Sequence, residues 1–125
     1  MRQFEREARL FSTRDGLPWR PMDYPSFLAS LEDERPAPEL GVELRALWHD
    51  ANGNAELAHR AAHASGGHAC LRIRAYLARK AGDERDARIK YWRAGAKPWE
   101  GSLESEWADI AQSVFVELHV ANAYQ

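Results

Sequence analysis

The stretch "AYLARKAGDERDARIKYWRAG" (residues 75–95) is a second, clearer copy of "ALWHDANGNAELAHRAAHASG" (residues 46–66). In each copy a glycine separates two segments rich in helix-forming residues, which is the pattern of two helices joined by a tight turn. The repeat therefore predicts two consecutive αα-hairpins. The positions shared at an offset of 29 residues are Ala46/Ala75, Gly53/Gly82, Ala58/Ala87 and Gly66/Gly95.

The length and composition of the chain favour one helical domain. It has 125 residues, 45% of them hydrophobic and 29% charged, which is a globular balance. Alanine is abundant while valine and isoleucine are scarce, and this argues against a large sheet. We therefore expect an all-α fold, a compact bundle of two αα-hairpins with flanking N- and C-terminal helices.

The flanking segments divide this single domain, residues 1–125, into three parts. Residues 1–22 are expected to form an arm, with a short helix over Phe4–Phe11 ended by Pro18 and Pro21. Residues 39–95 are the two-hairpin core, and residues 102–120 a C-terminal capping helix. Between arm and core, Asp23 is a predicted N-cap of a short helix. The residues expected on inward faces are Phe27, Leu28, Leu31, Leu40, Leu44, Leu47, Trp48, Ala51, Ala55, Ala58, Ala61, Ala62, Cys70, Ile73, Leu77, Ala81, Ala87, Tyr91, Ala94, Leu103, Trp107, Ile110, Ala111, Val114, Phe115 and Leu118.

The second hairpin resembles a tetratricopeptide repeat. In "GDERDARIKYWRA" a Gly-Asp turn precedes Ala87, Tyr91 and Ala94 at the spacing of that family's second helix. The chain departs from the family in its period of 29 rather than 34 residues, in Ser65, where the motif has alanine, and in having two units. The resemblance implies a tetratricopeptide-like bundle in which flanking helices replace the missing repeats.

Residues 44–95 also resemble a family of small uncharacterised bacterial proteins. The matching stretches are "LRALWHDANGNAELAH" and "AYLARKAGDERDARIKYWRAG". This resemblance implies no activity and therefore no site.

Charge is distributed unevenly along the chain. Residues 70–97 contain nine basic and three acidic side chains, a net charge of +6, whereas the remainder carries −8. One part of the surface is thus expected to be basic. These cations could pair with the acidic terminal segments, which is the reading we favour, or remain free for a partner.

The leading functional hypothesis is a protein partner or a second copy bound in a groove between the hairpins. Helix-pair scaffolds commonly bind peptides on such faces. Nucleic-acid binding through the basic face is a weaker alternative, because no nucleic-acid motif is present and the net charge is −2. The candidate partner contacts are Arg72, Tyr76, Arg79, Arg88 and Trp92.

A histidine cluster supports a second hypothesis, a small metal- or ligand-binding protein or conceivably an enzyme. His59 and His63 are four residues apart and would share a helix face, and His49 with Asp50 could add ligands. The intervening glutamate of a zinc hydrolase is missing, and surface histidines are the commoner explanation. No catalytic residue or cofactor is predicted, and Cys70 is expected in the core.

Two tryptophans beside prolines, Trp19 and Trp99, are expected to fold over helix ends.

The charged stretch at residues 1–16 is unlike a signal peptide, and no apolar run could span a bilayer. A cytoplasmic bacterial protein without a membrane partner is expected.

Overall fold

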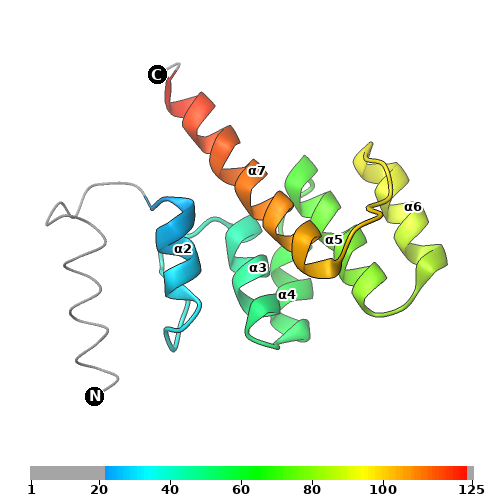
Figure 1. Ribbon diagram of the computed structural model, residues 1–125, viewed down its shortest axis with the longest axis horizontal. Coiled ribbons are helices and arrows are strands. Elements are labelled where there is room, and N and C mark those ends of the chain that lie inside the picture. Colours follow the sequence, from blue (N-terminus) through cyan, green and yellow to red (C-terminus); the bar gives the residue numbers. More distant parts are fainter. Residues whose placement is uncertain (1–21, 124–125) are drawn as a thin grey trace, which may run out of the picture.

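The computed structural model describes residues 22–123, which form six helices and no strand. Figure 1 shows them as a bundle in which α7 crosses the other helices. The predicted all-α bundle of two hairpins with flanking helices is therefore confirmed. The predicted arm, apart from Met22, and Trp19 lie outside the described residues. The helices are α2 (Tyr24–Ser30), α3 (Val42–Ala51), α4 (Ala55–Ala62), α5 (His68–Lys80), α6 (Glu84–Ala94) and α7 (Leu103–Ala123).

The two copies of the sequence repeat have the same structure at their hairpin turns. Gly53 and Gly82 both have positive φ, +79° and +84°, a conformation that glycine adopts without steric cost. The next amide closes the same bond in each hairpin, from Asn54 N to the His49 carbonyl and from Asp83 N to the Ala78 carbonyl. The side chains of Asn54 and Asp83 then cap the following helix, as expected for N-cap residues.

The two hairpins differ where their second helices end. α6 continues to Ala94 and is terminated by Gly95 at φ +67°, whereas α4 stops after eight residues. Arg74 satisfies one carbonyl group at the end of α4 and one beyond it by donating to Ala62 O at 2.9 Å and Ser65 O at 2.7 Å. A side chain of the second hairpin thus completes the helix end of the first.

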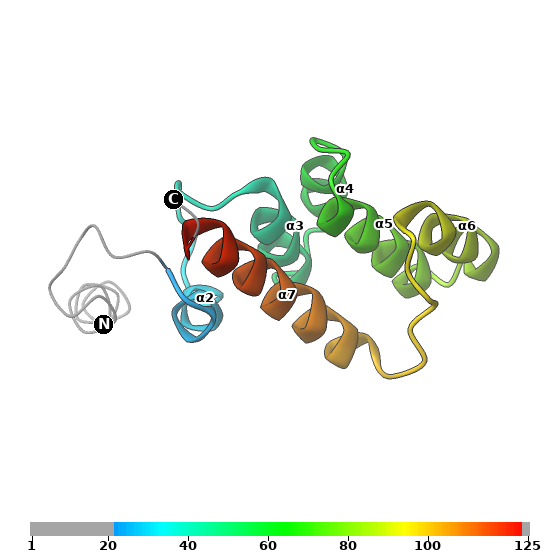
Figure 2. The ribbon, with the colours of Figure 1, turned by 90° about the horizontal axis from the view of Figure 1, so that it is seen from above.

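α7 crosses α5 and α3 and reaches α2, and Figure 2 shows it lying along the bundle from above. This packing places α7 against both hairpins and against α2. Phe27 of α2 stacks on Trp107 with ring centroids 5.9 Å apart. The indole of Trp107 donates to the Leu47 carbonyl at 3.1 Å, and that of Trp48 donates to the Ser30 carbonyl at 3.0 Å. The two indoles therefore anchor neighbouring helices with a bond as well as with apolar area.

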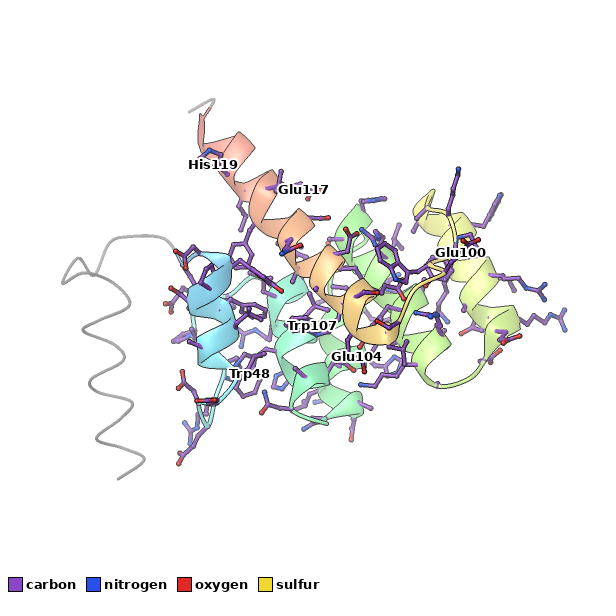
Figure 3. The ribbon with its side chains drawn as sticks, viewed as in Figure 1. Trp48, Glu100, Glu104, Trp107, Glu117 and His119 are labelled. Carbon is purple, nitrogen blue, oxygen red and sulfur yellow. The ribbon has the colours of Figure 1, made fainter. Side chains whose placement is uncertain are left out.

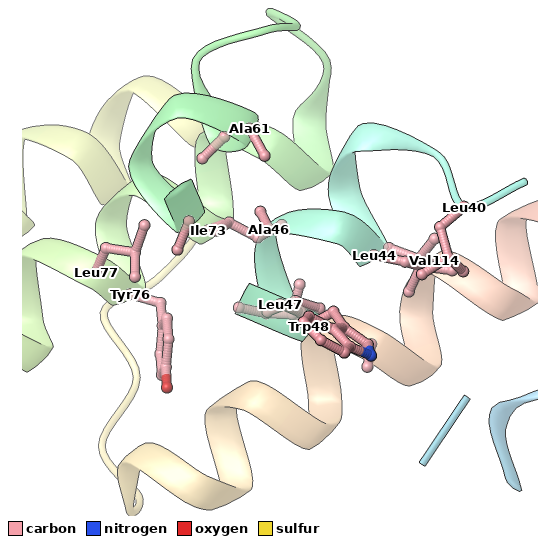
Figure 4. Packing of buried hydrophobic residues seen from close by; sticks show 14 of the residues in the cluster. Leu40, Leu44, Ala46, Leu47, Trp48, Ala61, Ile73, Tyr76, Leu77 and Val114 are labelled. Carbon is pink, nitrogen blue, oxygen red and sulfur yellow. The ribbon is translucent and has the colours of Figure 1, made fainter. Parts of the chain in front are cut away.

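The main core lies where α3, α4, α5 and α7 meet, and Figure 4 shows part of it from close by. A smaller cluster joins α5 to α6 through Ala75, Ala78, Ala87 and Tyr91. Trp99 packs against this cluster, and its indole donates to Ser105 Oγ at 3.0 Å, as predicted for a tryptophan folded over a helix end.

Five of the predicted inward positions are exposed in the structure: Leu28, Ala51, Ala55, Ala81 and Leu118. Ala51, Ala55 and Ala81 lie at or next to the end of a helix, where no neighbouring helix covers the apolar face. Leu28 lies on the short helix α2. Leu118 lies on the end of α7 that extends beyond the bundle, where Figure 3 labels Glu117 and His119.

Candidate functional site

Two arginines of α5 tie that helix to α7. Arg72 Nη2 lies 3.0 Å from Asp109 Oδ2, and Arg79 Nη1 lies 3.0 Å from Glu106 Oε1. Arg79 also donates to the Gly101 carbonyl in the segment that leads into α7. The expected pairing of the basic segment with an acidic terminal segment is confirmed for these two side chains.

Glu106 is the most deeply buried charged side chain of this interface, with no exposed surface. Besides Arg79, it accepts a hydrogen bond from the Tyr91 hydroxyl of α6. One carboxylate therefore joins α5, α6 and α7. Since a buried carboxylate is tolerated only when it is paired and hydrogen-bonded, both partners are needed to keep it inside.

A second carboxylate, Asp50 at the end of α3, has a matching arrangement. It accepts from the Tyr76 hydroxyl at 2.7 Å and lies 2.9 Å from Lys80 Nζ, both on α5. Tyr76 and Lys80 are four residues apart and so share a face of that helix. Asp50, like Glu106, therefore lies in a cluster of one carboxylate, one tyrosine and one cation.

Burial and the adjoining carboxylates raise the pKa of both tyrosines far above the ordinary value. For Tyr76 burial is the largest cause, followed by its hydrogen bond to Asp50; for Tyr91 it is burial and then the bond to Glu106. Both hydroxyls therefore stay protonated and keep donating. Among the described residues no buried side-chain nitrogen or oxygen lacks a partner, so the polar groups of the two clusters are satisfied within the bundle and hold the helices together.

The five candidate partner contacts do not form one groove. Tyr76 is buried beneath α7, and Arg72 and Arg79 are bonded to acidic side chains of the chain itself. Arg88 and Trp92 lie on α6, are exposed, and share a face because they are four residues apart. Of the five, only these two remain on an open surface.

That surface is the outer face of α6, defined here by Arg85, Arg88, Ile89, Trp92 and Arg93. Trp92 is 81% exposed and Ile89 42% exposed, and the three arginines are exposed. α6 lies at one end of the bundle, and side chains that end in nitrogen extend from it away from the other helices (Figure 3). A large apolar ring among cations is therefore presented to solvent.

The candidate metal ligands are not brought together. Asp50 is turned toward α5, while His49 packs edge-on against Trp48, and burial followed by the Arg45 charge lowers the pKa of that imidazole. On α4 the ring centroids of His59 and His63 are 6.3 Å apart, and His63 Nδ1 bonds the His59 carbonyl. No group of three or more His, Cys, Asp or Glu side chains in residues 22–123 could hold a metal ion.

Cys70 is fully buried in α5, as expected, and burial raises the pKa of its thiol. A protonated, enclosed thiol is a poor nucleophile. No helix within the described part of the chain is long and apolar enough to cross a membrane.

Sequence reasoning missed Glu106, Asp109 and Lys80 as partners in these clusters. Glu106 had a usable signal, because it lies three and four residues from Leu103 and Ile110 in the apolar stripe of α7. A carboxylate in such a stripe implies a buried cation opposite, and α5 is rich in arginine.

Comparison of the chain with protein-family models, with curated proteins and with solved structures finds no match.

Proposed function

We propose that this protein is a tetratricopeptide-like interaction module that binds a protein partner on the outer face of α6. The observation that carries the proposal is Trp92, a large aromatic side chain with 81% of its surface exposed at the end of a rigid helical bundle. Tryptophan is strongly enriched among residues that dominate binding energies. An exposed tryptophan beside a half-exposed isoleucine is unfavourable in water and becomes favourable when covered.

The two stacked hairpins supply the rigidity that such a site needs. Ala87, Tyr91 and Ala94, which carry the tetratricopeptide resemblance, are all buried, and the first two pack against Ala75 and Ala78 of α5. Tyr91 is further held by Glu106. The inner face of α6 is thus fixed to the bundle, so its outer face is preorganised for contact.

We include a bacterial cytoplasmic location in the same proposal, because a chain with one buried cysteine forms no intrachain disulfide and is compatible with a reducing compartment.

Site-specific photo-crosslinking in the native cells tests the proposal. The photoreactive residue p-benzoylphenylalanine is placed at position 92, and the matched control places it at position 60, an exposed arginine of α4. We expect a protein adduct of defined mass from position 92 and none of that mass from position 60. Because the probe at position 92 replaces Trp92 itself, it is also placed at position 89, where the exposed Ile89 adjoins the indole. Absence of a protein adduct at both positions 89 and 92, or the same adducts at position 60, would contradict the proposal.

A further inference from the structure

The outer face of α6 also indicates what kind of partner it fits. This inference rests on the proposed function and extends it from a protein partner to a particular chemistry. The starting point is where the positive charge of residues 70–97 remains once the bundle has formed.

Most cations of that segment are occupied inside the chain. Arg72 and Arg79 pair with α7, Lys80 with Asp50, and Lys90 with Asp86 one turn earlier on α6. Arg74 donates to backbone carbonyls at the end of α4. Folding therefore gives each of these cations of α5 a partner within the chain.

The remaining cations gather on α6 and just after it. Arg85, Arg88, Arg93 and Lys97 are exposed, and none forms an ion pair with a side chain among residues 22–123. The first and last of the three arginines are eight positions apart, or about 12 Å along the helix. Asp83, Glu84 and Asp86 lie beside Arg85 at the start of the helix and Asp86 is paired with Lys90, so from residue 87 to residue 97 every charged side chain is basic.

Apolar area lies within the same stretch of α6. Ile89 and Trp92 are three residues apart and so adjoin on the helix surface, and Arg85 and Arg88 lie on the turns before them. A partner that neutralises the arginines therefore brings its own side chains against the indole. An apolar residue between acidic ones would meet both requirements.

We propose that the outer face of α6 binds an acidic protein segment that carries a large apolar side chain, which packs on Trp92 while carboxylates pair with Arg85, Arg88 and Arg93. Arginine suits this role because its planar guanidinium accepts a carboxylate in a bidentate manner. Acidic residues on successive turns of a partner helix would match the arginine spacing.

Two other occupants fit the face less well. A second copy related by a two-fold axis would bring the same three arginines together, and like charges facing each other are unfavourable. Single-stranded nucleic acid prefers a series of stacking rings. On α6, Tyr91 is buried, so Trp92 is the one ring of that helix available for stacking.

Fluorescence anisotropy with defined probes tests this chemistry on the full chain. The main probe is a labelled 14-residue peptide with glutamates at i, i+4 spacing and leucine and phenylalanine between them. Two matched peptides replace either the glutamates with glutamine or the apolar residues with serine, and a 20-nucleotide oligothymidine probes nucleic-acid binding. Titrations are run at two salt concentrations, because binding that depends on ion pairs weakens with salt.

We expect the acidic apolar peptide to bind, and each matched peptide to bind at least about tenfold more weakly. Trp92→Ala should weaken binding about 30-fold and Arg88→Glu about tenfold or more. The control Arg60→Glu, which changes an exposed arginine of α4, should leave binding unchanged. Far-UV circular dichroism confirms that each variant is folded.

Failure of this inference is distinguishable from failure of the proposed function. If oligothymidine binds and the acidic peptide does not, the face is a nucleic-acid surface and the inference is wrong. It is also wrong if Trp92→Ala leaves peptide affinity unchanged, or if a protein crosslinks at position 92 while the acidic peptide does not bind. In that last case the proposed function stands and only the partner chemistry falls.

Discussion

Replacing Glu106 by glutamine should destabilise the bundle far more than the same change at Asp109. Both are acidic residues of α7 that pair with an arginine of α5 at 3.0 Å. They differ in burial, since the side chain of Glu106 has no exposed surface whereas that of Asp109 is 45% exposed. Glu106→Gln and Asp109→Asn therefore form a matched pair in which burial is the main variable.

The size of the effect follows from what each carboxylate leaves behind. Glu106→Gln preserves the shape of the side chain but removes the negative charge to which Arg79 and Tyr91 both donate hydrogen bonds. Breaking a buried pair costs about 3–5 kcal/mol, but the Arg79 side chain is 26% exposed and can be partly rehydrated. We expect a loss of about 2–3 kcal/mol in the free energy of unfolding, because the amide still accepts one hydrogen bond. Asp109→Asn should cost about 1 kcal/mol, because Asp109 is half-exposed and asparagine still accepts one hydrogen bond from Arg72, whose side chain is 14% exposed.

Urea denaturation followed by circular dichroism measures both changes, and thermal unfolding provides a second reading. The Glu106→Gln midpoint should fall by about 6–15 °C on heating, and by a few degrees at most for Asp109→Asn. The urea m-value should not change, because the same surface is exposed on unfolding. Equal losses in the two variants, or a Glu106→Gln loss below about 0.5 kcal/mol, would refute the reasoning that the buried cluster fastens α7.

Two further predictions concern the tyrosines and the hairpin turns. Because the folded-state pKa values of Tyr76 and Tyr91 are raised, their stabilisation is complete below the unfolded pKa of about 10 and is lost as pH rises above it, by about 1.4 kcal/mol per pH unit for each tyrosine. Urea midpoints from pH 9 to 11.5 should show this slope, and Tyr91→Phe should lower it by one tyrosine's share; an unchanged slope would argue against the raised pKa. In the second turn Gly82→Ala should cost about 1–2 kcal/mol, because φ is +84° while the added Cβ meets nothing within 4 Å. Gly66→Ala, where φ is not positive and the space is equally open, should change stability by less than about 0.5 kcal/mol, and similar losses at both glycines would contradict the conformational explanation.

Much of the fold was predictable because its signals are local. The offset between Gly53 and Gly82 predicted two hairpins, and the structure gives both glycines left-handed φ values followed by a capping side chain. Asp23 and Phe27 were likewise predicted in their observed roles. Errors such as Leu118 arose because periodicity identifies an apolar face but does not show where the neighbouring helix ends.

The candidate contacts were less predictable, since their availability depends on residues far away in sequence. Arg72 and Arg88 look alike in the chain, both being arginines on amphipathic helices. They separate only when α7 folds back and places Asp109 beside Arg72, 37 residues away. Tyr76 was likewise predicted as a partner contact from the sequence alone, but the other helices of the bundle bury it.

The sequence alone determined the helices, their turns and the repeat, because backbone propensity, glycine conformation and capping act between residues a few positions apart. The tertiary structure decided which charges stay on the surface, because neutralisation depends on distance in space. By placing Asp50, Glu106 and Asp109 against α5, the fold pairs cations of that helix with carboxylates of the same chain. It leaves the outer face of α6, with Trp92 among its arginines, exposed to solvent.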